Sequence, residues 1–415
     1  MDMTVSGPFV IVGAGPAGIR AAEILRQQAP DADILLIGEE SHLPYQRPPL
    51  SKAYLTDRLS AAQLYLKPEA FFAEHRIGLK LGCAAIRIDR PAKLVELADG
   101  EKVKYGRLLL ATGCRYRVLP PIPGGARVYY LRSLSDAERI REVLTPGAEI
   151  VMIGGGFIGL ELAASATQLG SRVTVLEAAP RLLARALPPL IGDFVRTLHE
   201  KHGVKFEFDS RLKSMEAGQN GRVLVRTERA EHNCDIVIAG IGAQPNTALA
   251  EAAGLEIDDG IRVDQYGRTS DPDIFAAGDV TRHHNPLLGR AIRVESWQVA
   301  LNQAAAVARA MLGTNEPYAE IPWLWTDQYD CNIQMLGLVE PDLDLVVRGD
   351  PASNQFTIIG LGPDRRIAAA ITVNNGREMS ALRRLIATKA IFPRETLADP
   401  GQKLSDLLKS AAPKP

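Results

Sequence analysis

The sequence predicts an α/β fold in which one strand–helix–strand unit, of the kind that binds a dinucleotide, occurs twice. Two glycine fingerprints, at residues 13–18 and 154–159, predict it. Each follows a short apolar run that is typical of a buried strand (residues 9–12 and 150–153) and precedes a helical pattern. A single fingerprint is weak evidence, but two copies in full strand–turn–helix–strand context indicate two bound dinucleotides.

The residue types of each fingerprint suit a phosphate group. Glycines allow the tight turn after the strand, and they let backbone N–H groups approach a pyrophosphate at the N-terminus of the next helix. An acid at the end of the following strand, about 20 residues on, accepts hydrogen bonds from ribose hydroxyls. The residues concerned are Gly13, Gly15, Ala17, Gly18 and Glu39 in the first copy, and Gly154, Gly156, Phe157, Ile158, Gly159 and Glu177 in the second.

Length and composition limit the class of protein. A chain of 415 residues is too long for one ordinary domain. A net charge of −1 argues against attraction of the whole molecule to nucleic acid or to an anionic membrane. No apolar run approaches the length of a bilayer, and no basic leader precedes the first strand. We therefore expect a cytoplasmic protein without nucleic-acid or membrane partners.

The chain has four cysteines, Cys83, Cys114, Cys234 and Cys331, and they lie far apart in the sequence. They form no C-x-x-C pair and show no metal-ligand spacing, so we expect inert thiols and no metal site. A disulfide reductase of this fold would carry a redox pair in the helix after the first fingerprint, and residues 19–28 contain no cysteine. Electrons are therefore not expected to leave through a thiol.

Both copies of the unit end in the same way. The first ends in an apolar strand at residues 105–110 and a small-residue turn at 111–113; the second ends in a strand at 235–239 and a turn at 240–242. The two halves therefore form an internal repeat. Residues 120–125, rich in Pro and Gly, have the composition of a linker between them.

The rest of the chain completes the domain plan. A further strand runs into Gly278-Asp279, and a helix follows near residues 296–312. The last part alternates like antiparallel strands, with two helical patterns after them. We expect a discontinuous first domain, a second dinucleotide-binding domain and a C-terminal α+β domain, with boundaries at residues 1–117 and 247–322, 118–246, and 323–415.

Four further segments are typical of a known family. They are Arg-Pro-Pro-Leu-Ser-Lys at 47–52, Ala-Thr-Gly at 111–113, Gly-Asp at 278–279 and Trp-Leu-Trp-Thr-Asp-Gln at 323–328. With them the chain resembles, over nearly its whole length, the flavoproteins of glutathione-reductase-like fold that bind two dinucleotides. Within these it resembles the NADH-dependent ferredoxin and rubredoxin reductases, above all the reductase components of bacterial aromatic-ring dioxygenase and cytochrome P450 systems.

The resemblance implies that the first copy binds FAD. The fingerprint would cradle the pyrophosphate, Glu39 would bind the adenosine ribose, and Asp279 the ribityl chain. The backbone near Trp297 would meet the isoalloxazine. Val299 stands where many members have asparagine, which removes an amide hydrogen bond there. The other FAD-binding residues that the resemblance implies are Arg47, Lys52, Ala111, Thr112, Gly113, Arg132, Gly278 and Ser296.

The second copy would bind NADH. Glu177 can hydrogen-bond a free 2′-hydroxyl and repels a 2′-phosphate, which favours NADH over NADPH, although Arg181 lies close enough in sequence to accept a phosphate. Phe157 is either a core aromatic or a ring at the nicotinamide pocket. The NADH-binding residues that we expect beyond the fingerprint are Glu161, Glu177, Gly240, Ile241 and Gly242.

Four residues are candidates for the reaction itself. The resemblance places Lys52 and Glu161 at the reactive edge of the flavin, where an ion pair between them would orient both rings and stabilise charge on the reduced flavin. Lys52 could instead be a surface lysine, and Glu161 an acid that stabilises a helix N-terminus. Trp325 matches a tryptophan near the flavin on the ferredoxin side, and Phe157 is the fourth candidate.

The expected enzyme is a ferredoxin–NAD⁺ reductase. Hydride passes from NADH to FAD, and electrons then pass singly to a [2Fe–2S] ferredoxin, which supplies a terminal oxygenase. Because such ferredoxins are usually acidic, we expect a transient electrostatic complex on a basic surface. Two alternatives remain: a stand-alone NADH oxidase or quinone reductase, and an NADH-sensing flavoprotein like the apoptosis-inducing factors. Candidate basic residues are Arg290, Arg293, Arg309, Arg383, Arg384 and Lys389.

Overall fold

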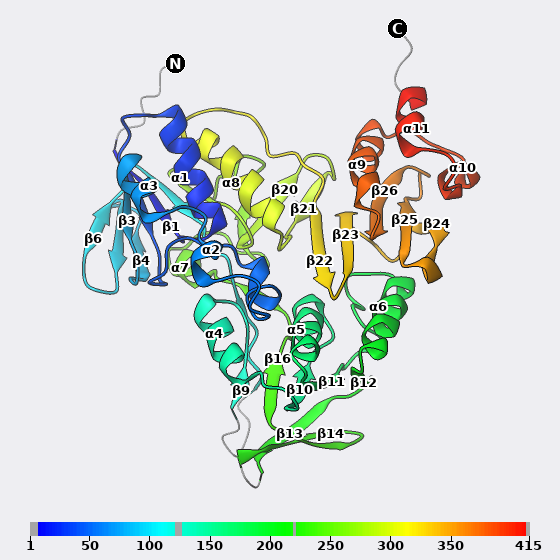
Figure 1. Ribbon diagram of the computed structural model, residues 1–415. Coiled ribbons are helices and arrows are strands. Elements are labelled where there is room, and N and C mark those ends of the chain that lie inside the picture. Colours follow the sequence, from blue (N-terminus) through cyan, green and yellow to red (C-terminus); the bar gives the residue numbers. More distant parts are fainter. Residues whose placement is uncertain (1–6, 121–126, 219–220, 412–415) are drawn as a thin grey trace. The chain divides into compact units, whose positions relative to one another are not determined.

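A computed structural model describes residues 7–120, 127–218 and 221–411 of the chain (Figure 1). The chain divides into two compact units. The predicted linker at 120–125 lies outside the described residues from position 121 on, and the division into three domains stays a prediction. The first unit comprises Met1–Pro48, Ser60–Arg115 and Ala243–Pro322; the second comprises Pro49–Leu59, Tyr116–Gly242 and Trp323–Pro415.

A five-stranded sheet with the order β19-β7-β1-β2-β3 forms the centre of the first unit. All four neighbouring pairs are parallel. The central strand β1 is buried and apolar throughout, and its neighbour β7 is so from Leu108 to Leu110, as parallel strands covered on both faces require. The strands are β1 (Phe9–Val12), β2 (Ile34–Ile37), β3 (Ile77–Lys80), β7 (Arg107–Leu110) and β19 (Ile274–Ala276).

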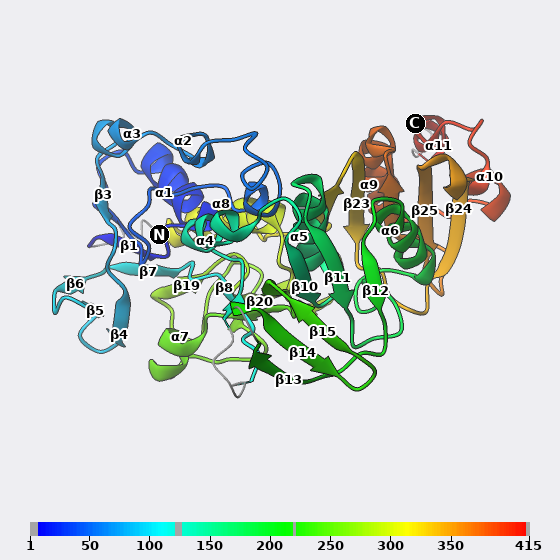
Figure 2. The same cartoon turned by 60° about the horizontal axis from the view of Figure 1, so that its bottom comes forward.

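The two faces of this sheet have different covers. Phe9 and Ile11 pack under α1 (Pro16–Gln28) and α8 (Trp297–Met311), which lie side by side in Figures 1 and 2. Val10 and Val12 face the other way, into a cluster with Val95 of an antiparallel meander, the three strands β4 (Ala85–Asp89), β5 (Leu94–Leu97) and β6 (Lys102–Lys104). Since strand residues alternate between faces, one short run of four apolar residues contributes to both cores.

Shorter elements complete the first unit. They are α2 (Ala61–Leu64), α3 (Glu69–Glu74), β4 (Ala85–Asp89), β5 (Leu94–Leu97), β6 (Lys102–Lys104), β17 (Ala243–Pro245), α7 (Ala248–Ala252), β18 (Ile261–Val263), β20 (Thr281–Asn285) and β21 (Arg290–Ile292). Two further elements begin in the first unit and end in the second: the 3₁₀ turn η1 (Pro48–Ser51) and strand β8 (Cys114–Tyr116).

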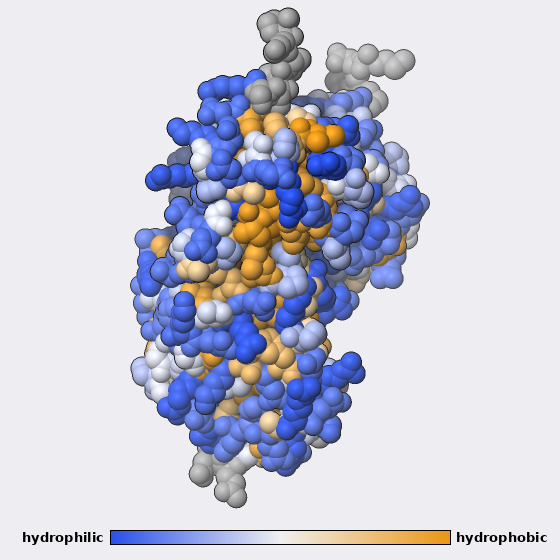
Figure 3. All heavy atoms as spheres, turned by 90° about the vertical axis from the view of Figure 1, so that its right-hand side faces the viewer, coloured by the Kyte–Doolittle hydropathy of each residue, from blue (hydrophilic) through white to orange (hydrophobic). Residues whose placement is uncertain are grey.

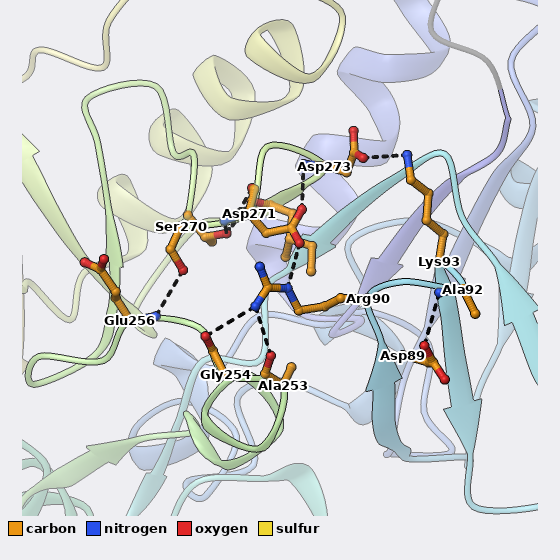
Figure 4. Close-up of polar contacts among 12 residues, drawn as sticks. Asp89, Arg90, Ala92, Lys93, Ala253, Gly254, Glu256, Ser270, Asp271 and Asp273 are labelled. Atoms are coloured by element: carbon orange, nitrogen blue, oxygen red, sulfur yellow. Dashed lines mark hydrogen bonds and ion pairs between the residues drawn. The ribbon is translucent and has the colours of Figure 1, made fainter.

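A polar brace joins three of these segments, as Figure 4 shows. Arg90, directly after β4, donates from Nε to Asp271 at 2.7 Å and from Nη1 to the carbonyls of Ala253 and Gly254, at the end of α7. Lys93 pairs with Asp273 at 2.5 Å. Charged groups therefore fix the meander to a loop 181 residues further along the chain.

The second unit also has a parallel sheet of five strands, in the order β12-β11-β10-β16-β9. Its central strand repeats the burial of β1, with Ile150 to Ile153 all buried. One face packs on a three-stranded antiparallel sheet. The strands and helices are β9 (Val128–Tyr129), α4 (Leu134–Val143), β10 (Glu149–Ile153), α5 (Phe157–Gln168), β11 (Arg172–Leu176), α6 (Pro189–Lys201), β12 (Lys205–Glu207), β13 (Leu212–Ala217), β14 (Val223–Thr227), β15 (Glu231–Cys234) and β16 (Ile236–Ala239).

The C-terminal part of this unit is an antiparallel sheet with the order β22-β23-β26-β25-β24. Apolar side chains of its inner face, Met335, Ile358 and Ile371 among them, share one core with Leu160 of α5 and Val195 of α6. The elements are β22 (Trp323–Gln328), β23 (Cys331–Gly337), β24 (Asp344–Asp350), η3 (Pro351–Ser353), β25 (Gln355–Leu361), β26 (Ile367–Val373), η4 (Gly376–Glu378), α9 (Met379–Thr388), α10 (Arg394–Ala398) and α11 (Leu404–Ala411).

In the described residues three helices follow this sheet, so the prediction of two was wrong in detail. The additional one, α10, has only five residues, too few for a periodic pattern.

Figure 3 shows the face of the molecule on the side of these helices, where a band of hydrophobic residues lies between hydrophilic ones. Among the helices that the structure describes, none combines the length and the apolar character of a membrane span.

Candidate functional site

The first glycine loop leaves space for a phosphate in front of a helix. Gly13 has a φ of +115°, and a Cβ there would lie 2.2 Å from the carbonyl oxygen of Ala111. A Cβ at Gly18 would lie 1.9 Å from the carbonyl oxygen of Gly13. Gly15 differs, because a Cβ there would meet nothing within 4 Å. Gly15 is the N-cap of α1 and has no side chain to cap it; Pro16 follows without an N–H, so the first N–H groups at this helix start are those of Ala17 and Gly18.

Residues distant in sequence meet at the same helix start. Gly278 has a φ of +84°, and a Cβ there would lie 3.2 Å from the Cβ of Ala17. Its N–H donates to Oε1 of Gln303 at 2.8 Å, and Gln303 is buried. The structure therefore brings the Gly278-Asp279 turn to the first fingerprint, with Asp279 half-buried. Gln303, which fixes this turn from α8, was not predicted.

A second unpredicted residue fixes the turn at 111–113. The side-chain amide of Asn246 donates to the carbonyl of Thr112 at 2.9 Å, and the Thr112 hydroxyl donates to the carbonyl of Asn246 at 2.9 Å. Gly113 takes a φ of +64°. This reciprocal pair holds the end of β7 next to the glycine loop, since Ala111 is the residue that Gly13 approaches.

The remaining candidates of the first unit surround this region unevenly. Glu39 is exposed after β2. Arg47 pairs with Glu40 at 2.6 Å and donates to the Tyr45 hydroxyl at 2.9 Å. Ser296 caps α8 and is buried, and Trp297, its first residue, is half-buried. Val299, the departure from the family pattern, is buried in α8.

The second glycine loop repeats the geometry of the first. Gly154 has a φ of +104° and lies against Gly240, whose carbonyl oxygen would be 2.6 Å from an added Cβ. A Cβ at Gly159 would lie 2.2 Å from the carbonyl oxygen of Gly154. Gly156 caps α5 without a side-chain bond, and the nearest atom to a Cβ there would be 3.9 Å away. Both loops therefore fit a pyrophosphate. In both, the N-cap residue is a glycine, which has no side chain to bond the N-terminus of the helix.

Glu177 has an additional role that the sequence did not indicate. Its Oε2 accepts a hydrogen bond from the N–H of Gly155 at 2.6 Å, and its Oε1 accepts from Ala179 at 2.7 Å. The carboxylate thus holds the fingerprint loop, and its contact with a ribose stays a prediction. Arg181 is used elsewhere, since its guanidinium donates to the carbonyls of Leu187 at 2.8 Å and Ala184 at 3.0 Å.

Other residues of the second loop differ in exposure. Phe157 begins α5, is half-buried and packs against the apolar core of the unit. Ile158 is exposed. Ile241 is half-buried, and Gly242 is exposed with a φ of +108°. This contact supports the interpretation of Phe157 as a core aromatic. Its role at the nicotinamide stays a prediction.

Lys52 and Glu161 form an ion pair, with Nζ 2.7 Å from Oε2. Both belong to the second unit, because residues 49–59 pack there. Glu161 is buried on α5, and it also accepts hydrogen bonds from Ser51 at 2.5 Å and from Thr326 at 2.6 Å. Ser165, one turn along α5, donates to the carbonyl of Ser51 at 2.7 Å. A surface position for Lys52 is excluded, since only 19% of its side chain is exposed.

Trp325 and Arg132 lie in the second unit too. Trp325 stacks on Trp323 with ring centroids 5.0 Å apart, and its Nε1 donates to Asp327 at 3.0 Å. The backbone N–H of Arg132 donates to Asp136, which forms a capping box with Ser133 at the start of α4. The six candidate basic residues divide three to each unit, and Arg293 is already paired with Glu295 and Asp259.

The cysteines are buried thiols. Burial raises the pKa of Cys234 to about 11 and that of Cys331 to about 12, so both stay protonated at neutral pH. In residues 7–120, 127–218 and 221–411 no three His, Cys, Asp or Glu side chains are grouped in a way that could hold a metal ion.

Comparison with known proteins gives matches along the whole chain. The family described as pyridine nucleotide-disulphide oxidoreductase matches residues 7–304, and the family described as reductase C-terminal matches residues 323–408. The ferredoxin–NAD(+) reductase component of an anthranilate 1,2-dioxygenase system from Burkholderia cepacia is 49% identical, over 97% of this chain and 99% of that protein. Putidaredoxin reductase from Pseudomonas putida is 37% identical, over 99% and 98% of the two chains.

The solved structures agree. The chain matches the reductase in a covalent putidaredoxin reductase–putidaredoxin complex with a TM-score of 0.94 at 37% identity, covering 99% of this chain and 100% of that one. A ferredoxin reductase for the CYP199A2 system from Rhodopseudomonas palustris gives a TM-score of 0.91, also at 37% identity, with 98% and 100% covered. These likenesses confirm the predicted fold class. The chain therefore belongs to the pyridine nucleotide-disulphide oxidoreductase family and carries that group's reductase C-terminal domain.

Proposed function

We propose that the protein is an FAD-dependent ferredoxin–NAD⁺ reductase that oxidises NADH and passes electrons to a [2Fe–2S] ferredoxin of an oxygenase system. The main support is the open space at Gly15 and Gly156, where two phosphate groups could lie. In addition, relatives that are named as such reductases match this chain over 97–99% of its length. The relative from Burkholderia cepacia belongs to a dioxygenase system, and putidaredoxin reductase and the CYP199A2 reductase point to P450 systems. A ring-hydroxylating dioxygenase or a P450 is therefore the proposed end user.

Two cofactors have a place in this chain. FAD, when bound, takes up a hydride and gives electrons up singly, which converts the two-electron chemistry of NADH into the one-electron chemistry of an iron–sulfur protein. The first unit would hold it through Gly13, Gly15, Gly18 and the Gly278-Asp279 turn. The second unit would hold NADH through its own loop, with Glu177 at the adenosine ribose.

The protein's own side chains would orient the nicotinamide and flavin rings and keep water away from them. Lys52 and Glu161 would border the nicotinamide and the flavin, where a fixed ion pair costs no reorganisation during hydride transfer. The buried position of Glu161 keeps water away from it. No side chain is asked to act as acid or base, because the cofactors carry the chemistry.

The surroundings of Glu177 and Arg181 favour NADH over NADPH. Glu177 would present a negative charge to the adenosine ribose, and the Arg181 guanidinium already donates to carbonyls of the loop at 182–187. A 2′-phosphate would meet repulsion without compensation, so NADH is the proposed donor. A cytoplasmic location stays a prediction.

Anaerobic mixing of the flavin-loaded protein with NADH or NADPH tests the proposal. Rapid loss of the oxidised-flavin absorbance with NADH, followed by reoxidation on adding a [2Fe–2S] ferredoxin, is expected. Reoxidation by oxygen or a quinone alone, with no effect of ferredoxin, would move the assignment to a stand-alone oxidase or quinone reductase. A long-lived reduced complex that no acceptor reoxidises would favour an NADH-sensing flavoprotein.

A further inference from the structure

A row of side chains in the second unit leads from α6 to Glu161. It comprises the half-buried Tyr329 and the buried His199, Gln328 and Thr326, each within hydrogen-bond distance of the next. We propose that His199 and Gln328 are positioning residues that aim the Thr326 hydroxyl at the Glu161 carboxylate. The proposal rests on the proposed function, which puts Glu161 beside the nicotinamide.

The row ends on one oxygen of Glu161. Lys52 and Ser51 donate to Oε2, at 2.7 and 2.5 Å, and Thr326 donates to Oε1 at 2.6 Å. Glu161, Ser51 and Thr326 are all at most 3% exposed, so water does not replace a lost donor readily. The Thr326 hydroxyl therefore decides whether the second carboxylate oxygen is satisfied.

A threonine hydroxyl can donate in several directions, and Gln328 removes that freedom. Its Nε2 lies 3.2 Å from Oγ1 of Thr326 and donates to it, which leaves the hydroxyl hydrogen for Glu161. The two residues are two apart on β22 and so share one face of the strand. That face is the buried one, opposite Trp323 and Trp325.

His199 in turn fixes the amide of Gln328. Its Nε2 lies 2.7 Å from Oε1 of Gln328, and because the amide nitrogen is used on Thr326, the ring must donate. Burial lowers the pKa of His199 to about 4, so the ring is neutral and carries one hydrogen. Tyr329 completes the order, since its hydroxyl lies 3.3 Å from Nδ1 and burial raises its pKa to about 12.

The hairpin holds Tyr329 in an unusual conformation to do this. Tyr329 follows β22 with a φ of +58°, in the left-handed region that residues other than glycine seldom adopt. Its ring stacks on His202 at 3.6 Å between centroids, which fixes where the hydroxyl points. The Tyr329 hydroxyl, which also has a hydrogen bond with Thr167, can then donate to Nδ1 of His199, and with the hydrogen of His199 on Nε2 each donor of the row is directed toward Glu161.

The row orients and does not conduct protons. An amide in the middle cannot pass a proton on without forming a rare tautomer, so Gln328 interrupts any relay. Without His199 the Gln328 amide is free to turn over and present its oxygen to Thr326. The hydroxyl then donates to Gln328, and Glu161 loses one of its donors.

The test is the rate of flavin reduction by NADH in anaerobic stopped flow. His199→Leu and Thr326→Val are each expected to reduce the rate constant at saturating NADH about tenfold, the loss of one hydrogen bond to a charged group. The double variant is expected to be no slower than Thr326→Val, because His199 acts through Thr326. His199→Gln, whose amide can donate to Gln328, is expected to recover part of the rate.

A matched control separates positioning from stability. Phe194 lies on the same helix, and its ring meets Phe356 of the same sheet at 5.5 Å, with no part in the row. Phe194→Leu is expected to lower thermal stability while leaving the reduction rate constant unchanged. Equal rates in His199→Leu and wild type, or effects of His199→Leu and Thr326→Val that multiply in the double variant, would overturn the proposal.

A readout without turnover distinguishes this proposal from the proposed function. ¹⁵N NMR of the His199 ring is expected to show the tautomer with hydrogen on Nε2. A hydrogen on Nδ1 alone would refute the positioning chain even in an active reductase. A wild-type flavin that NADH does not reduce would instead refute the proposed function, and the tautomer would still decide the orientation of the row.

Discussion

At the scale of single residues, the two glycines that we propose face the phosphates, Gly15 and Gly156, differ from their neighbours. Gly15 and Gly156 have negative φ values, −92° and −85°, that alanine also adopts. A methyl group at either position would meet protein atoms at no less than 3.9 Å, yet it would occupy the space in front of the helix. Gly13 and Gly154 cannot be replaced in this way, because their φ values are positive and their backbones are crowded.

Alanine at these two positions therefore separates binding from folding. Gly156→Ala is expected to raise the NADH half-saturation concentration at least about tenfold, a loss of about 1.4 kcal/mol, with unchanged flavin content and thermal midpoint. Gly15→Ala is expected to reduce the FAD content instead. Absorbance spectra, thermal unfolding and NADH titration check both variants. A Gly156→Ala protein with normal NADH affinity would mean that the second cradle is not the NADH site.

The Lys52–Glu161 pair should affect both chemistry and stability. Lys52→Met and Glu161→Gln are each expected to slow single-turnover reduction by NADH about tenfold or more. Lys52→Met also leaves a buried carboxylate without its cation, which is expected to cost about 2–3 kcal/mol of unfolding free energy. Arg172→Gln is the control, since its pair with Glu149 is exposed and worth less than about 0.5 kcal/mol. Unchanged single-turnover reduction in both variants of the buried pair would end this account of it.

Two buried histidines predict the response of stability to acid. Burial lowers the pKa of His199 and of His283 to about 4, with repulsion by a neighbouring histidine adding to it in both. The unfolded chain binds the proton more tightly than the folded one. The free energy of unfolding therefore has its full value above about pH 6.5 and falls as the pH drops toward 4, by about 3 kcal/mol for each ring. Urea midpoints from pH 7.5 to 4.5 measure it. His283→Leu should flatten the profile; an unchanged profile would mean that His283 is not buried neutral.

At the scale of elements, local signals predicted the sheets and loops well. Short apolar runs followed by glycines give the strand, the turn and the helix from neighbouring residues alone, so residues 13–18 and 154–159 could be found directly. Asn246, Gln303 and His199 could not, because their partners lie 25 to 134 positions away. Thr326 and Gln328 had a signal, namely two polar residues on the strand face opposite two tryptophans, but their partners are set by the tertiary fold.

The brace of Figure 4 shows how such distant contacts stabilise an element. Arg90→Gln removes the pair with Asp271 and the bonds to the end of α7, and we expect it to reduce unfolding free energy by about 1–2 kcal/mol. Arg87→Gln is the control on the same meander, because Arg87 is 65% exposed and lies 3.8 Å from Glu96. Equal urea midpoints for the two variants would show that the brace adds nothing.

At the scale of the whole molecule, charge bears on partner choice. The net charge of −1 supplies no general attraction for an acidic ferredoxin, so any steering must come from local basic residues. We expect ferredoxin-dependent turnover at limiting ferredoxin to fall several-fold between low and physiological salt, while reduction by NADH stays constant. Arg293→Gln should have little effect, since two acids already neutralise it. Turnover that is independent of salt would contradict an electrostatic complex.

The proposal that electrons leave the protein through a ferredoxin is tested most directly by NADH-driven reduction of cytochrome c. The flavin-loaded protein is measured with and without an added [2Fe–2S] ferredoxin. We expect little reduction by the protein alone and a large increase on adding ferredoxin, abolished when NADH is omitted. Equal rates with and without ferredoxin, together with rapid consumption of oxygen or quinone, would contradict it.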